Sequence, residues 1–172
     1  MEMLKSVIRD IPDFPKEGII FKDITPLLSN PDSFNKAIDT MKVRYKDKKI
    51  DRVVGVEARG FIFASALAYA LDCGVVMVRK PGKLPYKTYQ KTYSLEYGED
   101  TIEIHQDAFE NDQKIVIIDD VLATGGTLAA CIDLVKTNFN VGLVEVGFLI
   151  ELDFLKGRQK LGNIPIYSMM HF

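Results

Sequence analysis

The sequence predicts an α/β protein with a doubly wound, mainly parallel twisted sheet flanked by helices. Apolar runs bounded by loops alternate with stretches of helical periodicity along most of the 172 residues. The runs at 53–56, 74–78 and 115–118 are rich in valine and isoleucine without polar alternation. Such runs are typical of strands buried on both faces. Strand–helix alternation of this kind builds a parallel sheet with helices on both of its faces.

Composition and length predict one compact domain over residues 1–172, with neither internal repeats nor a linker. Apolar residues make up 47% and charged residues 27%, as in ordinary globular proteins. The net charge of −2 argues against nucleic-acid binding, because such domains usually carry a basic excess. No apolar run approaches the roughly 20 residues of a membrane span, so we expect no membrane association. Two cysteines outside any Cys-x-x-Cys pair and no recognisable signal peptide indicate a cytoplasmic protein.

The first part of the chain, about 1–30, predicts an N-terminal hood. Residues 1–11 carry apolar positions at helical spacing, and prolines end that helix. The stretch 14–28 is rich in Pro and Gly yet carries apolar side chains. It therefore either packs on the core or covers a flat apolar ligand, with Phe21 as the stacking face. Asn30, followed by proline, then predicts the start of a longer helix.

The strand at 53–56 is followed by Glu57-Ala58-Arg59-Gly60 and by a predicted helix at 61–71. A loop in this position has free backbone N–H groups beside the positive end of a helix dipole. Arg59 adds a fixed positive charge. These features favour an anion site, and a plain helix cap with a solvated Arg59 is the alternative.

Cations follow the next strand, 74–78, without a gap. Arg79, Lys80 and Lys83 stand in a turn that also contains Pro and Gly. They lie at the carboxyl end of a strand, where parallel sheets place their ligand crevice. A solvated charged surface is the alternative interpretation.

A long segment after these cations predicts a lid over about 81–105. Loops of this length inside compact domains usually serve as functional lids. The residues at 93–98 alternate as in a strand, and 101–105 form a second such run. We therefore expect a β-hairpin.

The stretch 114–127 carries the chemistry that the rest of the chain serves. Asp119 and Asp120 follow its buried strand, and their carboxylates can accept hydrogen bonds from hydroxyl groups. A turn of small residues then precedes a helix and forms an anion site from its backbone N–H groups; the turn and its boundary comprise Ala123, Thr124, Gly125, Gly126 and Thr127. A ribose that carries a 5′-phosphate satisfies both halves. A nucleotide triphosphatase would instead need a Gly-Lys-Ser/Thr loop, which the sequence lacks.

The remaining elements complete the alternation. We expect a helix at 127–139, a long strand at 141–152, a short helix at 155–161 and a final strand at 164–169.

The run Val116–Thr127 resembles the signature of the type I phosphoribosyltransferases, in which it binds the ribose 5-phosphate part of phosphoribosyl pyrophosphate. The Glu-x-Arg-Gly-Phe sequence resembles that family's pyrophosphate loop. The resemblance implies the type I phosphoribosyltransferase fold, with Asp119 and Asp120 on the ribose hydroxyls and 123–127 on the 5′-phosphate. For pyrophosphate it implies a set of charged and backbone groups, namely Glu57, Ala58, Arg59, Arg79, Lys80 and Lys83.

Two further segments are similar to the adenine-specific branch of that family. The hood carries its Phe-Pro, Gly-Ile and Phe-Lys-Asp pattern, which implies purine contacts by Ile20, Phe21 and Lys22, joined by Arg59. The lid carries Tyr-Ser-Leu-Glu-Tyr-Gly. That match implies catalytic roles for Glu96 near the purine and Tyr97 near the reacting sugar, beside the two aspartates.

The resemblance also implies an activity and its partners. The enzyme would transfer the 5-phosphoribosyl group from phosphoribosyl pyrophosphate to N9 of adenine, giving AMP and pyrophosphate in purine salvage. Mg²⁺ would be the cofactor, held mainly by substrate and water rather than by protein ligands. Relatives of this kind imply a homodimer.

Three alternatives stay open. One is a type I transferase for another acceptor, such as xanthine, hypoxanthine or orotate. Another is a non-catalytic regulator that senses phosphoribosyl pyrophosphate, which would need an added DNA-binding domain or a basic surface. The last is a subunit that makes the sugar donor, which would need an ATP site that the sequence does not show.

Overall fold

The computed structural model describes residues 2–94 and 98–172 of the chain. The described chain divides into two compact units, Met1–Arg44 and Tyr45–Phe172, and each is considered by itself.

The first unit contains a small antiparallel hairpin and short helices; its elements are α1 (Glu2–Ser6), β1 (Arg9–Pro12), β2 (Ile20–Asp23), α2 (Thr25–Ser29) and α3 (Pro31–Tyr45), whose last residue belongs to the second unit. The hairpin pairs Ile11 with Phe21, and an ion pair of 2.5 Å joins Arg9 to Asp23 across it. The prediction of one helix over 1–11 was wrong beyond Ser6. Cross-strand pairing outweighs the helical spacing of the apolar residues there.

The start of α3 confirms the predicted cap. The side-chain oxygen of Asn30 accepts a hydrogen bond of 3.0 Å from the backbone N–H of Ser33. This bond satisfies one of the donors that every helix leaves free in its first turn.

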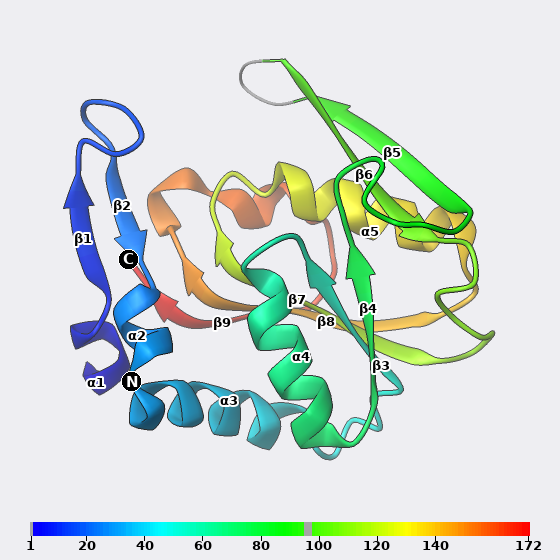
Figure 1. The fold of residues 1–172 in the computed structure, drawn as a ribbon, viewed down its shortest axis with the longest axis horizontal. Coiled ribbons are helices and arrows are strands. Elements are labelled where there is room, and N and C mark those ends of the chain that lie inside the picture. Colours follow the sequence, from blue (N-terminus) through cyan, green and yellow to red (C-terminus); the bar gives the residue numbers. More distant parts are fainter. Residues whose placement is uncertain (1, 95–97) are drawn as a thin grey trace. The chain divides into compact units, whose positions relative to one another are not determined.

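The second unit is built on a parallel sheet with the strand order β4-β3-β7-β8-β9 among the described residues. Figure 1 shows this sheet with β7 in its middle. The bounds of the strands are β3 (Arg52–Val56), β4 (Gly74–Val78), β7 (Lys114–Leu122), β8 (Gly142–Glu151) and β9 (Ile166–His171). The predicted doubly wound parallel sheet is confirmed.

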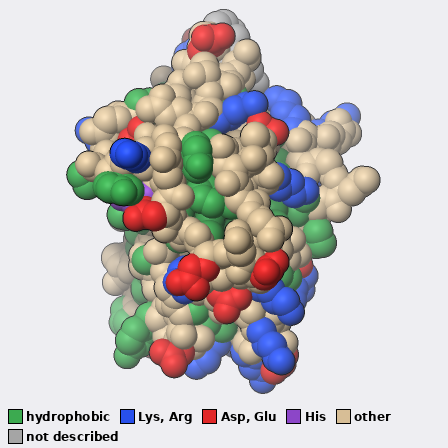
Figure 2. Space-filling view, turned by 90° about the vertical axis from the view of Figure 1, so that its right-hand side faces the viewer, with side chains coloured by type: hydrophobic (Ala, Val, Ile, Leu, Met, Phe, Trp, Pro, Cys, Tyr) green, Lys and Arg blue, Asp and Glu red, His purple; other side chains and the backbone are tan. Residues whose placement is uncertain are grey.

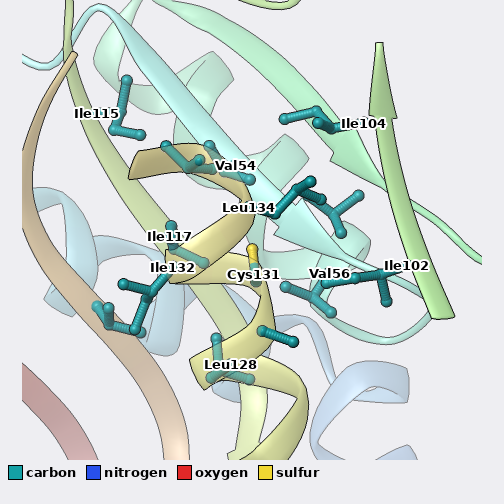
Figure 3. Packing of buried hydrophobic residues seen from close by; sticks show 14 of the residues in the cluster. Val54, Val56, Ile102, Ile104, Ile115, Ile117, Leu128, Cys131, Ile132 and Leu134 are labelled. Atoms are coloured by element: carbon teal, nitrogen blue, oxygen red, sulfur yellow. The ribbon is translucent and has the colours of Figure 1, made fainter. Parts of the chain in front are cut away.

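Two helices cover opposite faces of this sheet, α4 (Gly60–Leu71) and α5 (Gly126–Asn138) (Figure 1). On one face, a Cβ at Gly55 would lie 2.8 Å from the Ala64 side chain of α4. On the other face, alternate strand residues pack on α5 together with residues of the hairpin described next (Figure 3). The strands contribute Val54, Val56, Ile115 and Ile117, and the helix contributes Leu128, Cys131, Ile132 and Leu134. Burial of strands on both faces explains their unbroken apolar runs.

An antiparallel hairpin, β5 (Thr88–Ser94) with β6 (Glu99–His105), follows the sheet's edge strand β4 (Figure 1). Its first strand begins several residues earlier than predicted. A bridge between Arg79 and Glu103 joins the hairpin to the chain just after β4. The hairpin expected over 81–105 is therefore present.

The carboxyl side of the sheet departs from the prediction at two points. Strand β7 continues to Leu122, because β8 extends the ladder as far as the Leu122–Glu151 pair. The two acids consequently stand within the strand rather than after it. In place of the helix predicted at 155–161 are two 3₁₀ turns, η1 (Asp153–Leu155) and η2 (Gly157–Lys160). Lys156, with φ of 53°, separates them.

The charged side chains of the surface are of both signs. Acidic and basic groups are interspersed on the face drawn in Figure 2, in keeping with the net charge of −2. Within the described residues, no helix combines the length and the apolarity that crossing a bilayer requires.

Candidate active site

The last residues of β7 include the two predicted acids, which lie in different surroundings. Asp120 is buried, with 6% of its surface exposed, whereas Asp119 lines a small cavity. The backbone N–H of Asp120 donates to Oδ1 of Asp119 over 2.9 Å. A Cβ at Gly60 would lie 2.7 Å from that same oxygen. The first residue of α4 is therefore a glycine because the carboxylate occupies the space beside it.

Both carboxyl groups resist ionisation. Burial, reinforced by the neighbouring Asp120 carboxylate, raises the pKa of Asp119 well above its usual range. Burial also raises the pKa of Asp120, although the Arg59 guanidinium opposes that shift. The Arg59 Nε atom lies 2.8 Å from Oδ2 of Asp120, yet this oxygen receives no hydrogen bond from any residue that the structure describes. The pair thus keeps acceptor capacity for a ligand.

The predicted phosphate loop borders a cavity of about 90 Å³ directly after the acids. Gly125 is the N-cap of α5 and has φ of +77°, a conformation that side chains rarely adopt. No side chain of the described residues caps this helix start. Its first backbone N–H groups and the positive helix end are thus available to an anion. The five residues predicted for the phosphate, 123–127, line this cavity with four neighbours: Asp119, Val121, Leu122 and Leu128.

The loop after β3 is tied to the cations after β4. The Glu57 carboxylate accepts hydrogen bonds from the backbone N–H of Lys80 at 2.8 Å and from Arg79 Nε at 3.2 Å. Burial works against its charge, but these donors hold the pKa of Glu57 below its usual value. The Glu57–Ala58 peptide bond is cis. Glu57 thus orients the predicted pyrophosphate cations, and its own oxygens are already engaged by protein donors.

The other predicted cations have distinct positions. Arg59, which is predicted to contact both pyrophosphate and purine, forms an ion pair with Asp120. The Lys83 carbonyl accepts a hydrogen bond of 3.3 Å from Arg79 Nη1. The three cations at 79, 80 and 83 therefore gather beside the carboxyl end of β4.

Two residues of the hairpin join the phosphate loop to these cations, and sequence reasoning missed both. The Tyr93 hydroxyl donates to Asp100 over 3.1 Å and lies 3.0 Å from the Thr127 hydroxyl. Asp100 also pairs with the Lys80 ammonium. Burial opposes the charge of Asp100, yet the Lys80 hydrogen bond keeps its pKa below the usual value. Alternation in the hairpin could indicate a strand, but no local signal indicated these distant partners.

Three of the four predicted purine residues, Ile20, Phe21 and Lys22, lie in the first unit. Ile20 is exposed, and the Phe21 ring meets the Phe14 ring edge to face at 5.2 Å between centroids. Within that unit an apolar cavity of about 270 Å³ is lined by Ile11, Phe14, Phe21 and Asp23. The Lys22 ammonium pairs with Asp10 at 2.7 Å. The predicted catalytic residues Glu96 and Tyr97 lie outside the described residues.

A second acidic group stands at the ends of β8 and β9. Ligand atoms of Glu151, Asp153 and His171 lie within 4.8 Å of one another. Both oxygens of Glu151 already accept hydrogen bonds, from Arg158 and from Ser168. The oxygens of Glu151 are therefore already engaged by protein donors.

The fold and the site together define an α/β protein that binds a phosphorylated sugar. The family model of the phosphoribosyl transferase domain matches residues 23–159. The adenine phosphoribosyltransferase of Syntrophotalea carbinolica is 58% identical over 172 residues, which are 100% of each protein. The chain belongs to the adenine phosphoribosyltransferases.

Solved structures agree with this assignment. The adenine phosphoribosyltransferase of Thermoanaerobacter pseudethanolicus superimposes with a TM-score of 0.95 at 48% identity, covering 99% of both chains. The Saccharomyces cerevisiae enzyme, crystallised with adenine and an imino-altritol bisphosphate, gives a TM-score of 0.93 at 44% identity. That alignment covers 98% of this chain and 97% of the yeast chain.

Proposed function

We propose that the protein transfers the 5-phosphoribosyl group from phosphoribosyl pyrophosphate to N9 of adenine, giving AMP and pyrophosphate. The observation that carries the proposal is the pair Asp119 and Asp120 beside an uncapped helix start on the same strand end. One ligand, a ribose with a 5′-phosphate, uses both features. The yeast relative's complex with adenine supports the choice of acceptor.

The acid pair suits the transition state of this transfer. As the bond to pyrophosphate lengthens, positive charge develops on the sugar. Carboxylates that accept hydrogen bonds from the 2′- and 3′-hydroxyls place negative charge beneath that cation, and a preorganised charge acts strongly in a site with little water. The buried, weakly compensated state of Asp120 fits this role.

The leaving group would meet the cations after β3 and β4. Arg79, Lys80 and Lys83, with Arg59, supply charge and N–H donors for pyrophosphate oxygens. Glu57 holds Arg79 in place, so its fork is oriented before the substrate arrives. The β5–β6 hairpin would close over the site and exclude the water that would otherwise hydrolyse the sugar.

Mg²⁺ is the cofactor that we propose. It takes oxygen ligands and usually keeps several waters, with only one or two carboxylates from the protein. Asp119, which lines the cavity beside the phosphate loop, could supply such a single carboxylate to an ion that substrate and water would chiefly hold. When bound, the ion neutralises the departing pyrophosphate.

For Glu96 we propose proton transfer at the purine ring, and for Tyr97 a position near the reacting sugar. Replacing Glu96 by Ala should lower turnover by roughly 10²-fold or more, the usual contribution of a positioned acid or base. Binding of phosphoribosyl pyrophosphate should weaken far less. Steady-state kinetics with both substrates varied would separate the two effects; equal losses would make Glu96 a bystander.

In the first unit, the purine contacts that we propose are Ile20 and Phe21 as apolar ones and Lys22 as a polar one. The apolar cavity beside Phe21 supports a flat ligand there. We further propose that 1–172 acts as a single domain, with 1–30 as its hood and 81–105 as its lid.

We also propose a homodimer in the cytoplasm. Exposed apolar side chains on α4 and β4 support a protein interface; they are Ile62, Tyr69, Val75 and Met77. Both cysteines are free thiols, in keeping with a reducing compartment. Sedimentation analysis of the purified protein tests the assembly.

The decisive experiment mixes the protein with Mg²⁺, phosphoribosyl pyrophosphate and one base at a time. We expect mononucleotide and pyrophosphate with adenine and little product with hypoxanthine, xanthine or orotate. Product with another base in preference to adenine would leave a transferase of different specificity. Binding of the donor without any product would instead favour the sensing regulator.

A further inference from the structure

The turn between β8 and β9 presses its backbone against the phosphate loop. A Cβ at Gly125 would lie 2.5 Å from the carbonyl oxygen of Gly157. In return, a Cβ at Gly157 would overlap the carbonyl oxygen of Ala123 and lie 3.0 Å from Leu122 Cδ1. Two glycines thus allow two main chains to touch directly, with no flexible side chain between them. Any movement of Gly157 is transmitted to the loop.

An ion pair at the sheet's edge determines where that turn lies. Arg158, the residue after Gly157, donates from Nε to Glu151 Oε1 over 2.6 Å and from Nη2 to Oε2 over 2.7 Å. Glu151 is the last residue of β8 and has 4% of its surface exposed. The Ser168 hydroxyl of β9 donates to Oε2 over 2.5 Å. The planar fork therefore anchors the turn to two strands of the sheet.

The charge of this pair is fully engaged within the protein. Arg158 also reaches the Ile166 carbonyl and the Ser168 hydroxyl at 3.4 and 3.3 Å. Burial opposes the charge of Glu151, but the Arg158 and Ser168 hydrogen bonds lower its pKa. On the far side, His171 Nδ1 lies 3.8 Å from Glu151 and 2.8 Å from Asp153. An arginine so occupied has few donors left for a substrate.

We propose that Glu151 and Arg158 are positioning residues for the 5′-phosphate, acting through the backbone of Gly157 on Ala123–Gly125. The ion pair fixes η2, η2 supports the phosphate loop, and the loop aims its N–H groups at the anion. This inference rests on the proposed function, because it takes the loop to be the phosphate cradle. It assigns a role to an ion pair between a buried glutamate and an exposed arginine that the chemistry itself does not use.

The proposal separates the two substrates. A phosphate cradle that loses its support binds the sugar phosphate less well, since a shift of about 1 Å in a positioned group can cost up to roughly 10²-fold. Adenine has no contact with this loop in the proposed reaction, so its KM should stay nearly constant. A general loss of stability would change both values together.

The test compares Arg158→Lys with Lys160→Ala. Lysine keeps the charge but lacks the two-point fork, whereas Lys160→Ala removes an exposed cation from the same turn. Ribose 5-phosphate is titrated calorimetrically into wild type and both variants, and KM is measured for phosphoribosyl pyrophosphate and for adenine. We expect Arg158→Lys to weaken ribose 5-phosphate binding and raise the donor KM by about tenfold, with the adenine KM within about twofold. Lys160→Ala should match wild type.

Gly157→Ala probes the backbone contact without touching the ion pair and should give the same split between substrates. Glu151→Gln, which keeps the shape of the acceptor, serves where either variant fails to fold. Unchanged ribose 5-phosphate affinity in a folded variant, or equal changes in both KM values, would overturn the inference. Failure of wild type to bind ribose 5-phosphate would instead overturn the proposed function.

Discussion

The loops that follow β3, β4 and β7 all lie at the carboxyl ends of the sheet's strands. The pKa values of their carboxyl groups, however, are shifted in opposite directions. Asp119 and Asp120 have raised pKa values, since burial disfavours their charge and the Arg59 guanidinium offsets that effect only in part. Glu57 has a lowered pKa because Lys80 and Arg79 donate to it despite its burial. Neighbouring strands thus end in an acid pair whose ionisation is disfavoured and in a single acid whose ionisation is favoured.

This difference separates two uses of a carboxylate. A group whose oxygens already accept protein hydrogen bonds contributes to the shape of the site and to the position of nearby cations. A buried carboxylate that lacks such donors lowers the stability of the folded protein. Proteins keep such groups where a ligand later supplies the missing donors. The contrast is consistent with our proposal that Asp119 and Asp120 bind the sugar and that Glu57 supports the pyrophosphate loop.

The largest expected effect comes from Asp119→Asn combined with Asp120→Asn. Loss of the charge beneath the sugar cation should lower kcat/KM by about 10³-fold, the cost of removing a preorganised electrostatic group. A carboxyl group with a raised pKa makes the folded protein less stable as the pH rises toward that pKa. The double amide variant should therefore be at least as stable as wild type at pH 7. Activity assays and thermal melts would check both; near-normal turnover would contradict the assignment.

The same pair should set the acid limb of the pH profile. The carboxyl groups place negative charge beneath the sugar cation only when ionised, so kcat/KM for phosphoribosyl pyrophosphate should fall about tenfold per pH unit below their apparent pKa values. That limb should begin well above the ordinary aspartate value of 3.8. A flat profile down to that value would show that the two acids ionise normally.

Glu57→Gln should have a smaller effect and the opposite dependence on pH. The amide still offers one oxygen but removes the anion, so we expect about 1–3 kcal/mol less stability and a raised KM for phosphoribosyl pyrophosphate. The depressed pKa stabilises the folded protein above the unfolded value of 4.5 and ceases to do so as the pH falls. Denaturation at pH 7 and at about pH 4 should show the difference between wild type and variant shrinking in acid.

Tyr93→Phe should give the smallest change. It removes one hydroxyl that joins Thr127 of the β7 loop to Asp100 and hence to Lys80 after β4. The expected loss is about 1–2 kcal/mol of stability, the net contribution of two partly buried hydrogen bonds. Denaturant unfolding measures it, with Tyr86→Phe, on an exposed side chain, as the matched control.

Sequence patterns predicted the sheet because burial of its strands requires unbroken apolar runs, and they predicted the acids and the glycine turn because these are contiguous in the chain. They predicted a helix at 9–12 from the spacing of the apolar residues, but these residues form a strand that pairs with β2. They also ended β7 before Asp119, since only β8 shows how far the ladder extends. Contacts between distant residues leave no periodic mark in a sequence.

The chain's own order therefore determined the fold class, the order of its elements and the groups able to bind a ribose phosphate. The tertiary structure decided which carboxylates accept several hydrogen bonds from protein donors, as Glu57 does, and which hold a buried oxygen that accepts none from the described residues, as Asp120 does. It also brought Tyr93 to Thr127 and Gly157 to Gly125. The physical reason is that burial and hydrogen-bond partners belong to positions in space, which folding assigns only after the whole chain has packed.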